Sequence, residues 1–148
     1  MIETLFSKKM PRFLLTVGFV AVLLSASKAF AARGTLDPTF GSHGVVTTQF
    51  NNLPSSAQDI ALQADGKILV LGNVSLSDEQ SAKVIARYNS NGTLDTSFGV
   101  NGVVTVDTSI WSSSIALQTD GKIIVGGGNS GQFAVARYTS AGSLETSF

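Results

Sequence analysis

The sequence has no cysteine and only one histidine, His43. The lack of cysteine excludes disulfides, a thiol nucleophile and a cysteine-ligated zinc site. One histidine excludes a metal site built from several histidines of one chain. Charged residues make up only 14% of the chain, whereas glycine is frequent, with 15 residues. With 43% hydrophobic residues, this composition is typical of a folded chain with many tight turns, not of a disordered one.

The first 31 residues have the three parts of a secretory signal peptide. Basic residues between positions 8 and 12 are followed by the apolar run 13–25 and by small residues at Ala29 and Ala31. The run is shorter than the roughly 20 residues of a membrane-spanning helix. We therefore predict an N-terminal signal helix, cleavage after Ala31 and export. An uncleaved N-terminal anchor is the alternative, and Met10 is an alternative start.

Loss of this leader changes the charge of the chain. The whole sequence has ten basic and ten acidic residues. Four of the basic residues and one acidic residue lie in the leader, so six basic and nine acidic residues remain, a net charge of −3. Nucleic-acid binding rests on a basic surface. We therefore predict no nucleic-acid partner.

The rest of the chain is repetitive. Ile60–Val70 (IALQADGKILV) recurs as Ile115–Val125 (IALQTDGKIIV) with nine of eleven positions identical. Ala-Arg-Tyr occurs at 86–88 and again at 136–138. The segment Gly-Thr-Leu-Asp-x-x-Phe-Gly starts at Gly34 and Gly92, and a related one begins at Gly142. Such self-similarity is typical of repeat architectures. We place the first repeat at about 34–91, the second at about 92–141, and the start of a third connector at 142–148.

Each repeat contains four short runs that are rich in strand-forming residues and bounded by turn residues. The expected strands are 44–50, 59–64, 67–72 and 83–89 in the first repeat, and 102–107, 113–119, 122–127 and 133–139 in the second. Asp65-Gly66 and Asp120-Gly121 predict two-residue hairpin turns with positive φ angles.

Two of the predicted strands, at 68–71 and 123–125, are apolar without interruption, which indicates cover on both faces. The prediction is therefore an all-β fold of two four-stranded antiparallel propeller-type blades, a partial β-propeller. A two-sheet sandwich is the alternative. The Gly-Thr-Leu-Asp-x-x-Phe-Gly segment is expected to join one blade's outer strand to the next blade's inner strand, with Phe40 and Phe98 wedged between blades.

These blocks together resemble the bacterial delta-60 repeat family over residues 34–148. The resemblance implies a β-propeller and an exported protein, and it brings no catalytic or ligand residues. A propeller closes with about four to eight blades, and this chain carries two repeats and the start of a third. We expect further blades in a longer chain, or several copies of this one, to complete the ring.

Repeated charged residues are the first candidates for chemistry. Asp65 and Asp120 are interpreted as turn residues, because the lysine after each Asp-Gly would repel a calcium ion. Three further acids, at positions 37, 95 and 145, are expected to cap their own turns. Arg87 and Arg137 are expected to pair with a connector acid. Binding of an anionic ligand is the alternative for these arginines.

Two other candidates for chemistry are explained more simply as turns. The glycine run Gly126–Gly131 lacks the Lys-Ser/Thr ending of a phosphate loop, so it is interpreted as a turn between strands. His43 has no nucleophile or orienting acid specified near it, so it is interpreted as a solvated turn residue. We assign no catalytic, cofactor-binding or metal-binding residue, and we expect no cofactor.

The expected function is an exported, non-enzymatic binding or surface-scaffold module. Its recognition residues would lie in the variable loops 51–56, 75–81 and 108–112, because loops on a rigid frame carry recognition. Trp111, the only tryptophan, lies in the last of these and suits a protein or carbohydrate partner, although core packing is equally consistent with it. The alternative is a propeller-type hydrolase or lyase whose axial site needs further blades.

Overall fold

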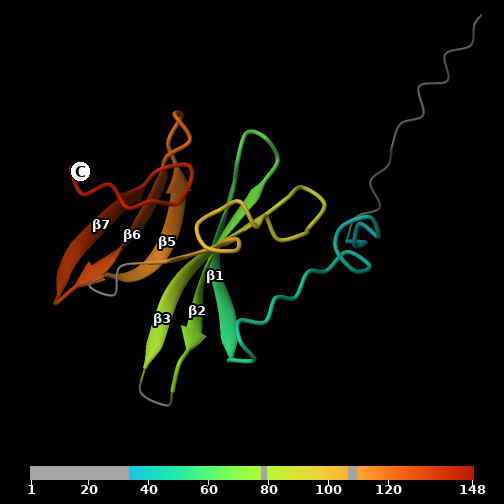
Figure 1. The fold of residues 1–148 in the computed structure, drawn as a ribbon, viewed down its shortest axis with the longest axis horizontal. Helices are drawn as coiled ribbons and strands as arrows, with labels where there is room; N and C mark the ends of the chain where they lie inside the picture. The colour runs from blue at the N-terminus through green and yellow to red at the C-terminus, as the bar shows by residue number, and fades with distance from the viewer. Residues whose placement is uncertain (1–33, 78–79, 107–109) are drawn as a thin grey trace, which may run out of the picture. The chain divides into compact units, whose positions relative to one another are not determined.

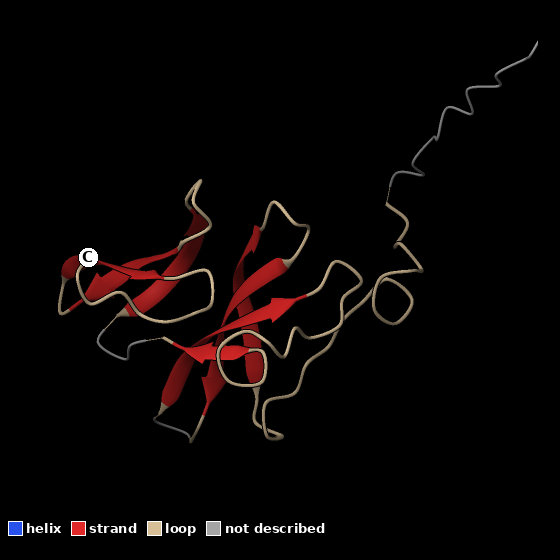
Figure 2. Ribbon diagram, turned by 45° about the horizontal axis from the view of Figure 1, so that its top comes forward, coloured by secondary structure: helices blue, strands red, loops and turns tan. Residues whose placement is uncertain are grey.

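The computed structural model describes residues 34–77, 80–106 and 110–148. The predicted signal helix and its cleavage site therefore lie outside the described residues. Within these ranges the chain consists of strands and loops (Figure 2). No helix in this part of the chain has the length and apolarity needed to cross a bilayer.

The strands form two antiparallel sheets (Figure 1). Sheet 1 has the order β1-β2-β3-β4, with β1 at Ser55–Leu62, β2 at Ile68–Ser75, β3 at Ser81–Tyr88 and β4 at Val103–Thr105. Sheet 2 has the order β5-β6-β7, with β5 at Trp111–Leu117, β6 at Ile123–Asn129 and β7 at Gln132–Tyr138. This arrangement is consistent with a partial β-propeller, and it corrects one prediction, since sheet 2 has three strands and not four.

The β1–β2 and β5–β6 hairpins lie where the repeated Asp-Gly pairs predict them, but their turns are longer than two residues. The Gln63 amide donates to the Lys67 carbonyl, and the Gly66 amide donates to the Gln63 carbonyl. Three residues therefore lie between the closing pair, as a β-turn followed by a glycine with a φ of 83°. Asp65 does not have the positive φ that was predicted for it.

The sequence-based prediction is wrong mainly about the strand that it places after each connector. Residues 44–50 form no strand and make only isolated bridges at their two ends. Residues 102–107 were expected to open the second blade, but the short β4 within them pairs with β3 and closes sheet 1. The connector Gly92–Gly99 therefore turns back within one sheet and does not lead from one blade to the next. Its reversal is local, because the Asp95 amide donates to the Arg87 carbonyl on β3.

Both sheets contribute to one hydrophobic core. Buried side chains from the six strands β2 to β7 form a single cluster with residues of the connector and of the link between the sheets. Phe98 is fully buried in this cluster, as the predicted wedge requires, whereas Phe40 is only half-buried. The predicted cover on both faces is found for one face of each sheet only. Leu69 is buried next to a half-exposed Ile68, and Ile123 is buried next to a half-exposed Ile124.

The glycine run at 126–131 is mostly strand and not turn, which corrects a second prediction. Gly126, Gly127 and Gly128 belong to β6, and the reversal falls on Ser130 and Gly131, both with positive φ. A Cβ atom at Gly127 would overlap the Trp111 carbonyl, because the β-bulge between Ser112 and Ser114 brings the two backbones together. In sheet 1, Gly72 faces the equivalent bulge and would collide with the Ser56 carbonyl.

Candidate functional site

The densest group of charges in sheet 1 surrounds Asp95. Its Oδ2 atom lies 2.8 Å from the Arg87 Nε atom and 2.9 Å from the Lys67 Nζ atom. Its Oδ1 atom accepts hydrogen bonds from the hydroxyl and the amide of Ser97. The Ser97 hydroxyl, followed by Lys67, holds the pKa of the Asp95 carboxyl well below its usual range, and Arg87 contributes a smaller effect in the same direction. Asp95 is thus a buried, ionised and fully paired acid.

The connector and two neighbouring strands place these charges. Arg87 lies near the end of β3, and Lys67 directly precedes β2 after the Asp-Gly turn. The guanidinium of Arg87 stacks on the ring of Phe98, 4.5 Å from its centroid. Because Phe98 follows Asp95 by three residues, one connector supplies both the acid and the aromatic face that fix the arginine.

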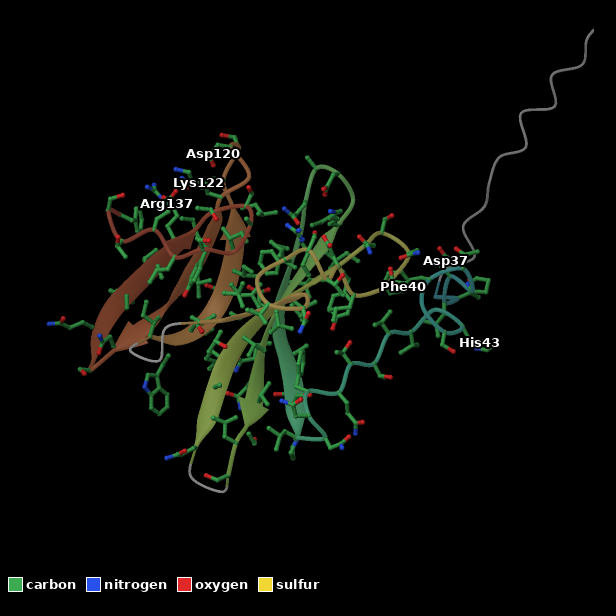
Figure 3. All side chains as sticks on the ribbon, in the orientation of Figure 1. Asp37, Phe40, His43, Asp120, Lys122 and Arg137 are labelled. Atoms are coloured by element: carbon green, nitrogen blue, oxygen red, sulfur yellow. The ribbon has the colours of Figure 1, made fainter. Side chains whose placement is uncertain are left out.

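Sheet 2 repeats the same group with a longer acid. Glu145 pairs with Lys122 at 3.0 Å and with the Nε atom of Arg137, and Arg137 stacks on Phe148 at 4.3 Å. Lys122 and then Arg137 lower the pKa of Glu145. Figure 3 shows Asp120, Lys122 and Arg137 at the same end of sheet 2. The predicted pairing of both arginines with a connector acid is therefore confirmed.

The Asp95 group also joins the two sheets. The Nη1 atom of Arg87 donates to the Ser140 carbonyl beyond β7 at 2.9 Å, and the Gly99 amide donates to the Ala141 carbonyl. On another edge, the Ile115 amide of β5 donates to the Asp59 carboxylate of β1 at 2.9 Å. Arg87 is therefore occupied by protein partners, which argues for a structural role over the alternative of an anionic ligand.

The first connector has the acid without the cations. The Asp37 Oδ1 atom accepts hydrogen bonds from the hydroxyl and the amide of Thr39, and these bonds lower its pKa. Among the described residues Asp37 makes no ion pair. Its predicted role as a cap of its own turn is confirmed, and so is that of Asp95. Glu145 departs from this prediction, since its carboxylate contacts Lys122 and Arg137 across the sheet.

The other acidic candidates and the histidine occupy turns. Asp65 and Asp120 each accept a hydrogen bond from the amide two residues later, at 3.1 Å. His43 is exposed, has a φ of 54°, and lies in the first connector with Asp37 and Phe40 (Figure 3). Its counterpart Asn101 has nearly the same φ, 51°. Both the Asp-Gly and the His43 interpretations as turns are confirmed.

Ligation of a metal needs several oxygen or nitrogen donors that converge. Within the described ranges no group of three or more His, Cys, Asp or Glu side chains comes together in that way. We call each group of paired charges a clamp, because one acid is shared between two cations of its own sheet. The clamp of sheet 1 is Asp95 with Arg87 and Lys67. The clamp of sheet 2 is Glu145 with Arg137 and Lys122.

The most exposed aromatic side chains lie elsewhere, across the strands of sheet 2. Trp111 is 80% exposed and Phe133 fully exposed. Trp111 opposes Gly128 in the β5–β6 pairing, and Gly128 opposes Phe133 in the β6–β7 pairing. Directly opposed residues share one face of a sheet. Trp111 and Phe133 therefore project from the same face, two strand spacings apart, or about 9–10 Å, with a glycine between them.

Sequence reasoning located only one member of this pair. Trp111 was assigned to a loop, but it is the first residue of β5. Phe133 was taken for an ordinary strand residue, although it replaces the charged Lys83 of the equivalent position in sheet 1. An aromatic residue at a position that is charged in the other repeat is the signal that could have found it.

Comparison with known protein families adds one match. A model described as a β-propeller domain of unknown function (DUF5122) matches residues 63–98 and 118–148. This match supports a β-propeller repeat family. The two matched ranges each begin just before an Asp-Gly turn and reach the phenylalanine of the following connector, so each range contains one turn, one group of paired charges and one connector. No curated protein and no solved structure matches the chain.

Proposed function

We propose that this β-propeller module is exported, is non-enzymatic and binds carbohydrate through Trp111 and Phe133. The bacterial delta-60 repeat is the specific family to which we assign it, on the repeated blocks quoted above. Export rests on the leader-like first 31 residues, and cleavage after Ala31 would leave a mature chain of charge −3.

The aromatic pair is the observation that carries the binding proposal. Single exposed apolar side chains are ordinary on soluble proteins, whereas exposed apolar side chains grouped in one patch mark interaction sites. Aromatic faces also stack well on flat, weakly polar groups. Gly128 leaves the floor between Trp111 and Phe133 without a side chain. The resulting slot has the width to admit a single sugar ring between the two aromatic groups.

The repeated charges support the non-enzymatic part of the proposal. Arg87, Asp95 and Lys67 contact one another and the connector, and Arg137, Glu145 and Lys122 do the same in sheet 2. A group that acts as an acid, base or nucleophile must be able to reach a substrate. Hydrolysis or elimination on a panel of chromogenic glycosides and uronides would instead favour the enzymatic alternative.

The fluorescence of the single tryptophan provides a direct test of binding. Titration with soluble oligosaccharides selected on a glycan array is expected to shift Trp111 emission, and Phe133→Ala is expected to weaken binding at least about tenfold. Leu76→Ala is the matched control, since Leu76 is also exposed but lies outside the pair. Binding that is equally strong in Phe133→Ala, or a complete lack of glycan binding, would contradict the carbohydrate proposal and leave a protein partner.

Mass spectrometry of the exported protein tests the proposed export and cleavage of the leader. A mature N-terminus at Ala32 is expected. Retention of residues 1–31 in the membrane fraction would contradict cleavage and favour the anchor.

A further inference from the structure

Equivalent rows of side chains cross the two sheets, and their chemistry differs. Three directly opposed residues of sheet 2 form what we call the aromatic row: Trp111, Gly128 and Phe133. The equivalent residues of sheet 1 are also directly opposed and form what we call the polar row: Ser56, Asn73 and Lys83. In each sheet one residue pair separates the row from the β-bulge of the first strand, so the two rows occupy the same place in their repeats.

The polar row stays accessible although sheet 2 packs on the same face of sheet 1. Residues two apart on a strand project to the same side, so Asn73 shares a face with Leu71. Lys83 likewise shares a face with Ile85. Both of these core residues are fully buried. Ser56 is nevertheless exposed, and Asn73 and Lys83 are half-buried. The row therefore lies beyond the contact between the sheets, where a neighbouring sheet leaves it open to solvent.

The two rows lie at the same end of neighbouring strands. The Ile115 amide of β5 donates to the Asp59 carboxylate of β1 at 2.9 Å. Asp59 follows Ser56 by three residues, and Ile115 follows Trp111 by four. Since β1 and β5 run in the same direction (Figure 1), the rows are level with each other. Packed sheets are roughly 10 Å apart, so one extended ligand can contact both rows.

Lys83 gives the polar row a positive charge that has no acid beside it in the described chain. The other lysines and arginines of the described ranges each pair with a carboxylate. The Lys83 Nζ atom instead donates to the Oε1 atom of Gln58 at 2.7 Å. An ammonium group has three N–H donors, and a half-buried charge is stabilised by an opposite one. The polar row is therefore suited to an anionic group.

The β-bulge of β1 holds this ammonium group in place. Gln58 is the residue that the bulge leaves without a partner on β2. Bulges re-aim side chains, and here the Gln58 amide reaches from β1 to Lys83 on β3. Asn73 lies on β2 between them, and its side-chain amide makes no hydrogen bond to any described residue. The row thus combines a positioned cation with an amide that is available to a ligand.

A further polar group lies on the part of sheet 2 that faces sheet 1. Ser112 opposes Gly127, which is two residues from the fully buried Val125, so Ser112 projects toward the core. Ser112 is 1% exposed, and its hydroxyl has no partner among the described residues. A buried hydroxyl is costly unless a hydrogen bond satisfies it. The sheets therefore meet near the two rows through a polar contact, which favours a ligand rich in hydroxyl groups.

We propose that Lys83 and Asn73 bind the anionic group of an acidic glycan, of which another ring is held between Trp111 and Phe133. This inference rests on the proposed carbohydrate function and names its ligand class, an oligosaccharide that carries carboxylate or sulfate groups. The aromatic row stacks on one sugar ring. The polar row supplies a charge-assisted hydrogen bond to the acidic group.

The preference for acidic over neutral sugars, measured by calorimetric titration of the exported protein, tests the inference. Hexamers of galacturonate and of mannuronate are each compared with their methyl esters, and sulfated galactose hexamers with desulfated ones. In at least one pair the acidic member is expected to bind at least about tenfold more tightly. The pair that shows the preference identifies the anionic group as carboxylate or sulfate. Higher ionic strength is expected to weaken binding of the acidic member alone.

Variants assign the preference to Lys83. Lys83→Gln is expected to reduce it to less than about threefold, whereas Lys83→Arg keeps the charge and retains it. Phe133→Ala is expected to weaken both members of a pair alike and to leave their ratio unchanged. The matched control is Lys122→Gln, which removes a lysine next to the other hairpin turn (Figure 3) and is expected to keep the preference. Circular dichroism confirms that each variant is folded.

The outcomes separate this inference from the carbohydrate proposal. Equal binding of both members in every pair, or a preference that survives in Lys83→Gln, would overturn the acidic subsite and leave carbohydrate binding intact. A lack of binding to every glycan would overturn both. Inorganic polyphosphate carries charge without sugar rings and is expected to bind weakly. Polyphosphate binding as tight as that of the acidic hexamers would show that charge alone is sufficient, which contradicts the shared site.

Discussion

The two sheets have nearly the same sequence but bury opposite faces. Ile115 on β5 is 8% exposed, and its counterpart Ile60 on β1 is 65% exposed. The relation reverses on the other face, where Ile85 on β3 is fully buried and Val135 on β7 is 53% exposed. Sheet 2 is buried on the face that carries Ile115, whereas sheet 1 is buried on the opposite, non-equivalent face, which carries Ile85. Equivalent residues are thus expected to contribute differently to the free energy of unfolding, because their neighbours differ.

The largest expected difference between the sheets is in the core. Ile85→Ala is expected to lower the free energy of unfolding by about 3 kcal/mol, because it leaves a cavity in a packed cluster. Val135→Ala is expected to cost less than about 0.5 kcal/mol in the monomer, since Val135 is mostly solvated. Urea unfolding at low protein concentration measures both. Equal losses would contradict the one-sided burial.

The clamps give the next difference. Asp95→Asn is expected to cost about 2 kcal/mol, because it removes a charge that Arg87 and Lys67 share in a buried position. Glu145→Gln is expected to cost less, since the Glu145 side chain is 17% exposed, against 9% for Asp95. Thermal unfolding of the two variants gives the comparison. A larger loss for Glu145→Gln would show that the clamp of sheet 2 is the stronger one.

The pH dependence of stability follows from the same clamp. The folded-state pKa of Asp95 lies below its unfolded value of 3.8, so the unfolded chain binds more protons than the folded one between these two values. The contribution of Asp95 is therefore complete above about pH 5 and is lost as the pH falls through and below 3.8. The stability difference between the wild type and Asp95→Asn, measured from pH 6 to pH 3, is expected to shrink. A constant difference would mean that the clamp does not depend on the charge of Asp95.

The turns should give the smallest effects and no difference between the sheets. Gly66 and Gly121 have φ angles of 83° and 81°, and a Cβ atom would meet only ordinary contacts at either site. Gly66→Ala and Gly121→Ala are each expected to cost about 1 kcal/mol from backbone strain. Unfolding of the single and double variants tests whether the two costs are equal and additive. Unequal costs would show that the turns depend on the surrounding structure.

The parts of the fold that were predicted correctly depend on residues close in sequence. The Asp-Gly reversals, the positive φ of Gly66 and the solvated turn at His43 each involve a few consecutive residues. The pairing of Arg87 with Asp95 spans only eight residues and recurs as Arg137 with Glu145. Repetition made these features predictable, because a residue type that returns at the same place in each repeat serves the same local geometry.

The errors concern contacts that pattern alone does not specify. The segments at 44–50 and 102–107 share a sequence pattern, yet only the second contains a strand, because β3 stands beside it. The glycines at 126–128 were read as a turn, but they form a strand where the bulge opposite Gly127 brings two backbones close together. Phe133 was missed because a strand residue's exposure depends on which sheet face is covered.

The sequence by itself determined the repeat, the turns, the clamps and the leader-like start, since each of these rests on side chains within reach along the chain. The tertiary structure decided which strand closes which sheet and which face of each sheet is buried. The physical reason is that a strand has two edges and two faces of similar chemistry, and only the presence of a neighbour removes one of them from water.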